Sequence, residues 1–175
     1  YITSPAFRQM ALFSPKNQKM LFMGLNVSGA EVLYPFIILL VILFLHAYYA
    51  KVKFQLEDYF LAILLLMLSV THFHPQWFLW VTPFLIIYLI KTEFKYSLLV
   101  ISLVLAWFTI TLFFESSLSY GLFNPINPNL KDAAGLSEIV ANYTDVFQLK
   151  SLVRSYFAAS SLFIFWTSAK EKSLF

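Results

Sequence analysis

Histidine, glutamine and tryptophan side chains gather within one otherwise apolar stretch, which reads SVTHFHPQWFLWVTPFLIIYLI over residues 69–90. Histidine and glutamine can donate hydrogen bonds to a phosphate or to sugar hydroxyls, and tryptophan can stack on the face of a sugar ring. The stretch is therefore a candidate binding site. Its candidate members are His72, His74, Gln76, Trp77 and Trp80.

Arg154 is the sixth candidate for this site. It stands about three residues inside a later apolar stretch, and the planar guanidinium matches the geometry of a phosphate. The alternative is that its side chain only snorkels to a membrane surface. Lys150 and Lys16 are weaker candidates, because attraction to anionic lipid headgroups already accounts for them.

A plainer interpretation of the histidine stretch stays open. Any connection between two apolar helices must be polar, Pro75 ends one helix and starts the next, and tryptophans collect at membrane interfaces. A metal site is not expected, because His72 and His74 stand two residues apart with no third ligand in view.

The composition indicates a membrane protein. Apolar residues make up 60% of the 175 residues and charged residues only 12%, and the mean hydropathy is +0.74. So few polar side chains cannot coat a soluble globule of this size. We expect an all-α, polytopic transmembrane bundle, multi-pass in the plasma (inner) membrane, with membrane lipids and no nucleic acid as partners. Its five expected spans are residues 32–49, 54–71, 76–90, 97–114 and 152–169.

Lysines in the short connections predict the orientation of this bundle. They follow the first, third and fifth spans, and lysine-rich ends are cytoplasmic. The candidate site, residues 1–31 and the loop 115–150 would then lie on the extracytoplasmic side. The lysines concerned are Lys51, Lys53, Lys91, Lys95, Lys170 and Lys172.

The outer segments are expected to contain short interfacial helices. Ser4 before Pro5 and Ser14 before Pro15 are typical helix starts, which makes 1–31 a segment of interfacial helices ahead of the bundle in 32–175. In the loop 115–150, apolar residues from Leu136 to Phe147 recur at helical spacing. The opening residues read like the middle of a loop, so we expect a C-terminal fragment of a longer chain.

The segment HPQWFLWVTP resembles the pattern S-P-Q-Y-x-x-W-x-x-P of polyprenyl-phosphate-sugar-dependent membrane glycosyltransferases of the C superfamily, notably the mannosyltransferase-like members. Pro75, Gln76, Trp80 and Pro83 stand at matching positions. His74 replaces the serine, and Trp77 replaces the tyrosine. The resemblance covers about ten residues.

The resemblance implies that the candidate binding site holds a substrate. It also implies transfer of a sugar from a polyprenyl-phosphate donor to a glycan or lipid acceptor at the extracytoplasmic surface. The lipid phosphate leaves, so such a site needs a carboxylate base and a cation or hydrogen-bond donors for the phosphate. In this family the base lies in a first outer loop, upstream of this chain. The fragment alone is therefore expected to be inactive. Four carboxylates in this chain are not assigned as bases, namely Glu115, Asp132, Glu138 and Asp145.

Two other functions fit the same sequence. A non-catalytic polytopic protein, such as a lipid-linked sugar transporter, would place charged or broken positions near the centres of its spans, and these centres are nearly free of charge. A polymerase or ligase of lipid-linked polysaccharide would use the same histidines and arginine.

Overall fold

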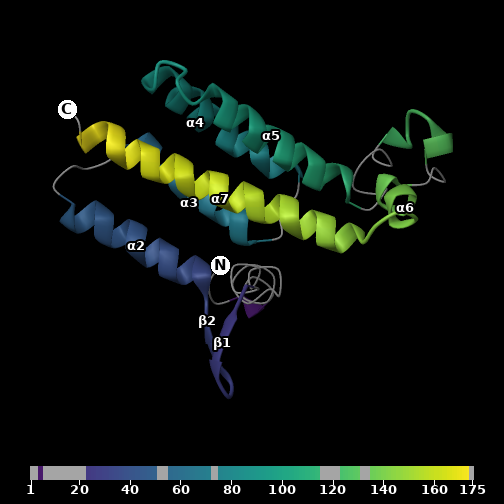
Figure 1. The fold of residues 1–175 in the computed structure, drawn as a ribbon, viewed down its shortest axis with the longest axis horizontal. Coiled ribbons are helices and arrows are strands. Elements are labelled where there is room, and N and C mark those ends of the chain that lie inside the picture. The colour runs from purple at the N-terminus through teal and green to yellow at the C-terminus, as the bar shows by residue number, and fades with distance from the viewer. Residues whose placement is uncertain are drawn as a thin grey trace.

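The computed structural model describes residues 4–5, 23–50, 55–71, 75–114, 123–130 and 135–173, with side chains of the last range as far as Lys170. Helices account for most of these residues and lie side by side, beyond a small hairpin (Figure 1). In chain order the elements are β1 Leu25–Ser28, β2 Glu31–Leu33, α2 Pro35–Tyr49, α3 Leu56–Val70, η3 Pro75–Trp77, α4 Phe78–Lys91, α5 Ser97–Leu112, η6 Pro128–Leu130, α6 Leu136–Ala141 and α7 Val146–Ser173.

Helix α7 holds the bundle together. Figure 1 shows it crossing the molecule with α2 on one side and α4 and α5 on the other. Phe157 and Ile164 of α7 are at most 1% exposed. They share one apolar core with Leu65 and Leu68 of α3 and Leu103 of α5. A smaller cluster fixes α2 against α3.

Local sequence explains where two of these helices begin. At α3 a capping box operates, because the Gln55 side chain accepts from the Asp58 N–H while the Asp58 carboxylate accepts from the Gln55 N–H. At α7 the Asp145 carboxylate accepts from the N–H groups of Phe147 and Gln148. Each cap satisfies amide donors that a helix start would otherwise leave without partners.

The prediction of a polytopic transmembrane bundle is wrong. Over the ranges that the structure describes, no helix combines the length and the apolar character needed to cross a bilayer. Helices occupy all five apolar stretches, but α2 to α5 contain only 14 to 16 residues each, or roughly 21–24 Å, against about 30 Å of hydrocarbon. Helix α7 is longer, at 28 residues, but serines, Lys150 and Arg154 interrupt its apolar character.

The localisation as a multi-pass protein of the inner membrane is wrong for the same reason. The assignment of cytoplasmic and extracytoplasmic ends presupposed spans, so it falls as well. The lysine-rich ends remain a property of the sequence. In the structure Lys91 is paired with carboxylates of a neighbouring helix, as described below.

A β-hairpin, which the sequence reading missed, precedes the helices. Strands β1 and β2 pair antiparallel, with Leu25 opposite Leu33 and Asn26 opposite Val32. Gly29 at the turn has a φ of +54°, a left-handed backbone that suits glycine. Of the expected helices in 1–31, Ser4 and Pro5 are described; Ser14 and Pro15 lie outside the described residues.

The segment before the fifth apolar stretch also differs from its prediction. We expected one surface helix whose apolar residues ran from Leu136 to Phe147, but α6 ends at Ala141 and α7 begins at Val146. The cap formed by Asp145 explains the break, because its carboxylate occupies the amides that a continuous helix would bond internally. Helix α7 therefore starts six residues before the expected 152.

A buried hydrogen bond joins α4 to α7 deep in the bundle. The hydroxyl oxygens of Tyr88 and Thr167 are 2.7 Å apart, and both side chains are at most 2% exposed. The Thr167 hydroxyl already donates to the Ile164 carbonyl at 2.9 Å. Tyr88 must therefore be the donor of the bond to Thr167.

We predict that Tyr88→Phe lowers the free energy of unfolding by about 1 kcal/mol, because a buried donor is lost without a large change in volume. Chemical denaturation measures the change. Tyr156→Phe is the matched control, since the Tyr156 hydroxyl donates to Ser102 at the same 2.7 Å but at an exposed position where water can replace it. Equal losses in the two variants would contradict the prediction.

Candidate functional site

The clearest feature of the candidate site is a bond between Arg154 and the far end of α3. Nη1 of Arg154 donates to the Thr71 carbonyl at 2.7 Å, across 83 positions of sequence. Arg154 is half-buried and Thr71 is only 2% exposed. The bond therefore holds the Arg154 guanidinium at the C-terminal end of α3.

The end of α3 explains why a donor is needed there. The Thr71 amide and hydroxyl both bond back to the Met67 carbonyl, the hydroxyl at 2.6 Å, which closes the last turn. The Thr71 carbonyl lies beyond that turn and has no partner within the helix. Arg154 donates a hydrogen bond to it, and the guanidinium charge also interacts favourably with the negative end of the α3 dipole. Arg154 thus has a structural role whatever it binds.

Burial lowers the pKa of Arg154. A guanidinium nevertheless stays protonated at neutral pH, so a positive charge persists in a partly desolvated place. Electrostatic attraction is stronger here than in bulk water, which favours an anion as the ligand. The fork of N–H groups suits a phosphate in particular.

The other described candidates lie on η3 and the first turns of α4. Gln76 is exposed, and Trp77 is half-buried against the main core. The rings of Trp77 and Trp80 stack, with 5.7 Å between centroids and 10° between planes. Trp80 is 54% exposed, so one anchored tryptophan supports a second that is accessible to a ligand.

His72 and His74 lie outside the described residues. Both belong to the segment bounded by Thr71, which accepts the bond from Arg154, and Pro75, which begins η3. Their roles in binding stay a prediction. Over the residues that the structure does describe, no group of three His, Cys, Asp or Glu side chains is placed to hold a metal ion.

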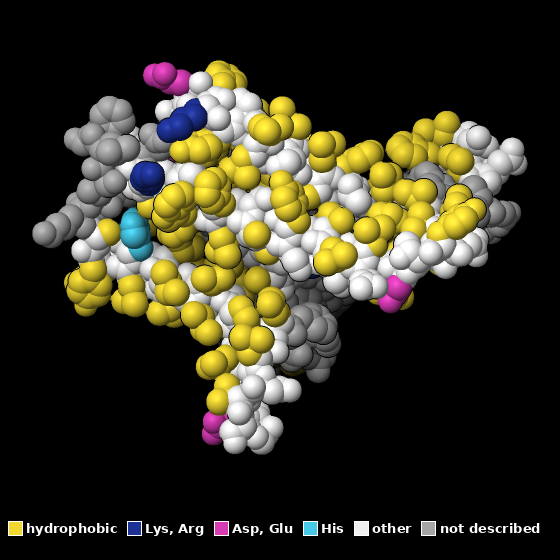
Figure 2. All heavy atoms as spheres, in the orientation of Figure 1, with side chains coloured by type: hydrophobic (Ala, Val, Ile, Leu, Met, Phe, Trp, Pro, Cys, Tyr) yellow, Lys and Arg dark blue, Asp and Glu magenta, His cyan; other side chains and the backbone are white. Residues whose placement is uncertain are grey.

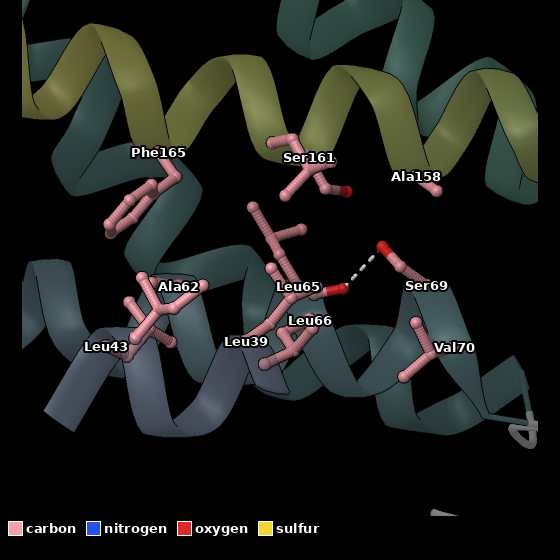
Figure 3. Close-up of a pocket in the computed structure, with 12 residues that line it drawn as sticks. Leu39, Leu43, Ala62, Leu65, Leu66, Ser69, Val70, Ala158, Ser161 and Phe165 are labelled. Atoms are coloured by element: carbon pink, nitrogen blue, oxygen red, sulfur yellow. Dashed lines mark hydrogen bonds between the residues drawn. The ribbon is translucent and has the colours of Figure 1, made fainter. Parts of the chain in front are cut away.

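An apolar pocket, which the sequence reading missed, lies between α2, α3 and α7 (Figure 3). It holds about 90 Å³ of enclosed room, and about 530 Å³ of empty space when the open solvent at its mouth is counted. Small side chains on facing helices leave this room. Its lining includes Leu43, Ala62, Leu65, Ser69, Ala158 and Ser161.

The small residues are the signal that could have revealed the pocket. Ala62 and Ser69 are seven positions apart on α3, and Ala158 and Ser161 are three apart on α7, so each pair lies along one helix face. A single sequence does not say which helices face each other. The spacing alone therefore did not indicate a cavity.

Polar groups at the other end of α3 form an ion-pair cluster. Nζ of Lys91 lies 2.7 Å from a Glu57 oxygen and 3.2 Å from an Asp58 oxygen. The hydrogen bond from Lys91 holds the pKa of the Glu57 carboxyl below its usual value. Acids at the start of α3 and a lysine at the end of α4 also suit both helix dipoles. We interpret this cluster as structural.

Among the described carboxylates of residues 115–150, the structure identifies no catalytic base. Asp145 caps α7, and Glu138 is exposed in the first turn of α6, a helix of only six residues. Glu115 and Asp132 lie outside the described residues. We therefore still assign none of them as the base.

Comparison with protein-family models, with curated proteins and with solved structures gave no match. They therefore give no support for a glycosyltransferase, and the resemblance to the mannosyltransferase-like members of the C superfamily stays a prediction. What remains is a likeness over about ten residues, His74 to Pro83. Any function must be argued from the chemistry of the site.

We predict that Arg154→Met lowers the free energy of unfolding by about 1.5–3 kcal/mol, because the buried Thr71 carbonyl loses a charged donor. Chemical denaturation measures the loss. Arg154→Lys should lose less, since it retains a cation at the end of α3. Lys150→Met is the control on the same helix, and an equal loss there would contradict the special role of Arg154.

A second prediction concerns pH. The pKa of Glu57 is lowered on folding, so its ion pair stabilises the protein above the ordinary carboxyl pKa, and this contribution is lost as pH falls through the lowered value. Lys91→Met should raise the Glu57 titration midpoint toward its ordinary value. Carbon NMR of the carboxyl measures it. An unmoved midpoint would show that Lys91 is not the cause; Lys150→Met, at the other end of the bundle, is the control.

Proposed function

We propose that this chain binds a polyprenyl-phosphate sugar where α3 ends and η3 begins, and that it serves the transfer of that sugar to a glycan or lipid acceptor. One observation carries the proposal. The bond from Arg154 to Thr71 holds a half-buried positive charge beside the segment whose sequence resembles that of enzymes using such donors. A phosphate is the leaving group of that reaction, and a held cation stabilises it.

The remaining candidates fit the sugar part of the donor. Trp80 offers an accessible ring supported by Trp77, and an indole face can cover the apolar face of a hexose. Gln76 is exposed on η3 and can both donate to and accept from sugar hydroxyls. His72 and His74 are proposed as further donors. We assign no base to this chain.

The outer surface supports a lipid as partner. Hydrophobic side chains cover much of the face in Figure 2, and Phe44, Leu79 and Leu98 are 68%, 70% and 80% exposed. Exposed apolar surface of this extent is typical of proteins that contact other proteins or lipids. A lipid-linked donor would be met at such a surface, so we propose membrane lipids as partners.

The proposal is tested by transfer of the hexose from polyprenyl-phosphate hexoses to added glycan or lipid acceptors, with free polyprenyl phosphate as the second product. The complete gene product carries single substitutions. Arg154→Gln, Gln76→Ala and Trp80→Ala should each lower the rate roughly 30- to 150-fold, as expected for about 2–3 kcal/mol of lost transition-state binding. Arg154→Lys should retain part of the activity, because a cation remains. Unfolding curves recorded alongside separate lost binding from lost folding.

Two control variants match these substitutions. Trp166→Ala removes a tryptophan that is 53% exposed on α7, against 54% for Trp80, and Gln148→Ala removes an exposed glutamine from the start of α7. Both should keep nearly full activity. The proposal fails if the folded protein transfers no hexose from any donor, or if the three site variants match their controls.

A further inference from the structure

We propose that the pocket between α2, α3 and α7 holds the hydrocarbon chain of a lipid phosphate, with the phosphate at Arg154. This inference rests on the proposed function for the choice of an isoprenoid lipid and for the phosphate at Arg154. It assigns a binding site to residues that took no part in the sequence prediction, namely the facing small residues of α3 and α7.

The two serines that line the pocket have no hydroxyl proton left to donate to an occupant. The Ser69 hydroxyl donates to the Leu65 carbonyl at 2.7 Å, and the Ser161 hydroxyl donates to the Phe157 carbonyl at 2.8 Å. Figure 3 shows the Ser69 bond turned back along its own helix. All other lining side chains are apolar. A hydrocarbon fits this lining, whereas a sugar or peptide would lose hydrogen bonds to water.

The pocket and Arg154 lie in line along both helices. On α7, the positions 154, 158, 161 and 165 share one face, and the last three line the pocket. On α3, the lining residues Ser69 and Val70 are followed directly by Thr71, which accepts from Arg154. In Figure 3, Ala158 and Val70 lie at the same end of the pocket. The backbone of Arg154 is one helical turn before Ala158 along α7, a rise of roughly 6 Å.

The mouth of the pocket favours a single chain as the occupant. Ile42 of α2 and Leu162 of α7 also line it and are 48% and 52% exposed, whereas Leu65 at its floor is 2% exposed. A helix of a partner, about 10–12 Å across, needs an open groove. A lipid chain is thinner. The positive charge at one end selects a lipid with an anionic head, which we identify as a phosphate.

Binding of farnesyl phosphate to the purified complete gene product tests the inference. Titration calorimetry should show binding, while inorganic phosphate and farnesol should each bind at least about tenfold more weakly, because each lacks half of the recognised ligand. Ala158→Phe should weaken binding at least about tenfold by filling the pocket. Ala159→Phe, at the exposed neighbouring position, is the matched control and should bind normally.

A second measurement avoids substitutions in the lining core. The chain contains no cysteine, so Leu162→Cys places a thiol at the mouth, and its labelling is read by mass spectrometry of the peptide that carries it. Farnesyl phosphate should slow this labelling severalfold. It should leave Leu105→Cys unchanged, because Leu105 is 58% exposed on α5, which takes no part in the pocket.

Each contrary result overturns the inference in a definite way. If inorganic phosphate binds as tightly as farnesyl phosphate, the pocket does not hold the chain. If farnesol binds as tightly, Arg154 does not hold the phosphate. If farnesyl phosphate binds without protecting position 162, it binds elsewhere. Binding and protection without hexose transfer would leave this inference standing and reject the proposed function.

Discussion

The packing of α3 against α7 is the contact on which the rest of the molecule depends. Leu65 and Leu68 of α3 meet Phe157 and Ile164 of α7 in one core, and α4 and α5 add to that core on the side away from α2. The same pair of helices forms both features that could bind a ligand. Their ends bring Arg154 to Thr71, and their small facing residues leave the pocket.

Helix positions in this chain follow from its sequence, but helix lengths do not. Apolar runs bounded by proline, serine or lysine locate α2 to α5, because such runs are stable only when they are removed from water. Hydropathy counts apolar residues without regard to where backbone hydrogen bonding stops. The Asp145 cap and the hairpin turn at Gly29 are local features that stop a helix or reverse the chain. The predictions of a long surface helix and of a spanning bundle were therefore wrong, and the hairpin was missed.

The candidate site likewise has a part that adjacent residues predict and a part that they do not. A polar segment around Pro75 with tryptophans beside it is visible in adjacent residues. Gln76 and Trp77 lie on η3, and Trp80 lies in the first turn of α4. The bond between Arg154 and Thr71 joins residues 83 positions apart, and no periodic pattern encodes it. The pocket is harder still to predict, because it depends on three helices meeting at particular faces.

The structural role of Arg154 affects how natural variation at this site should be interpreted. Because its guanidinium caps α3, selection for a stable fold would preserve it even in a chain that binds nothing. Ala158 is under the opposite pressure, since a larger apolar residue there would fill empty space and stabilise the bundle. A small residue that persists at 158 across related chains would therefore be the evolutionary trace of an occupied pocket, whereas a persistent arginine at 154 would not distinguish binding from folding.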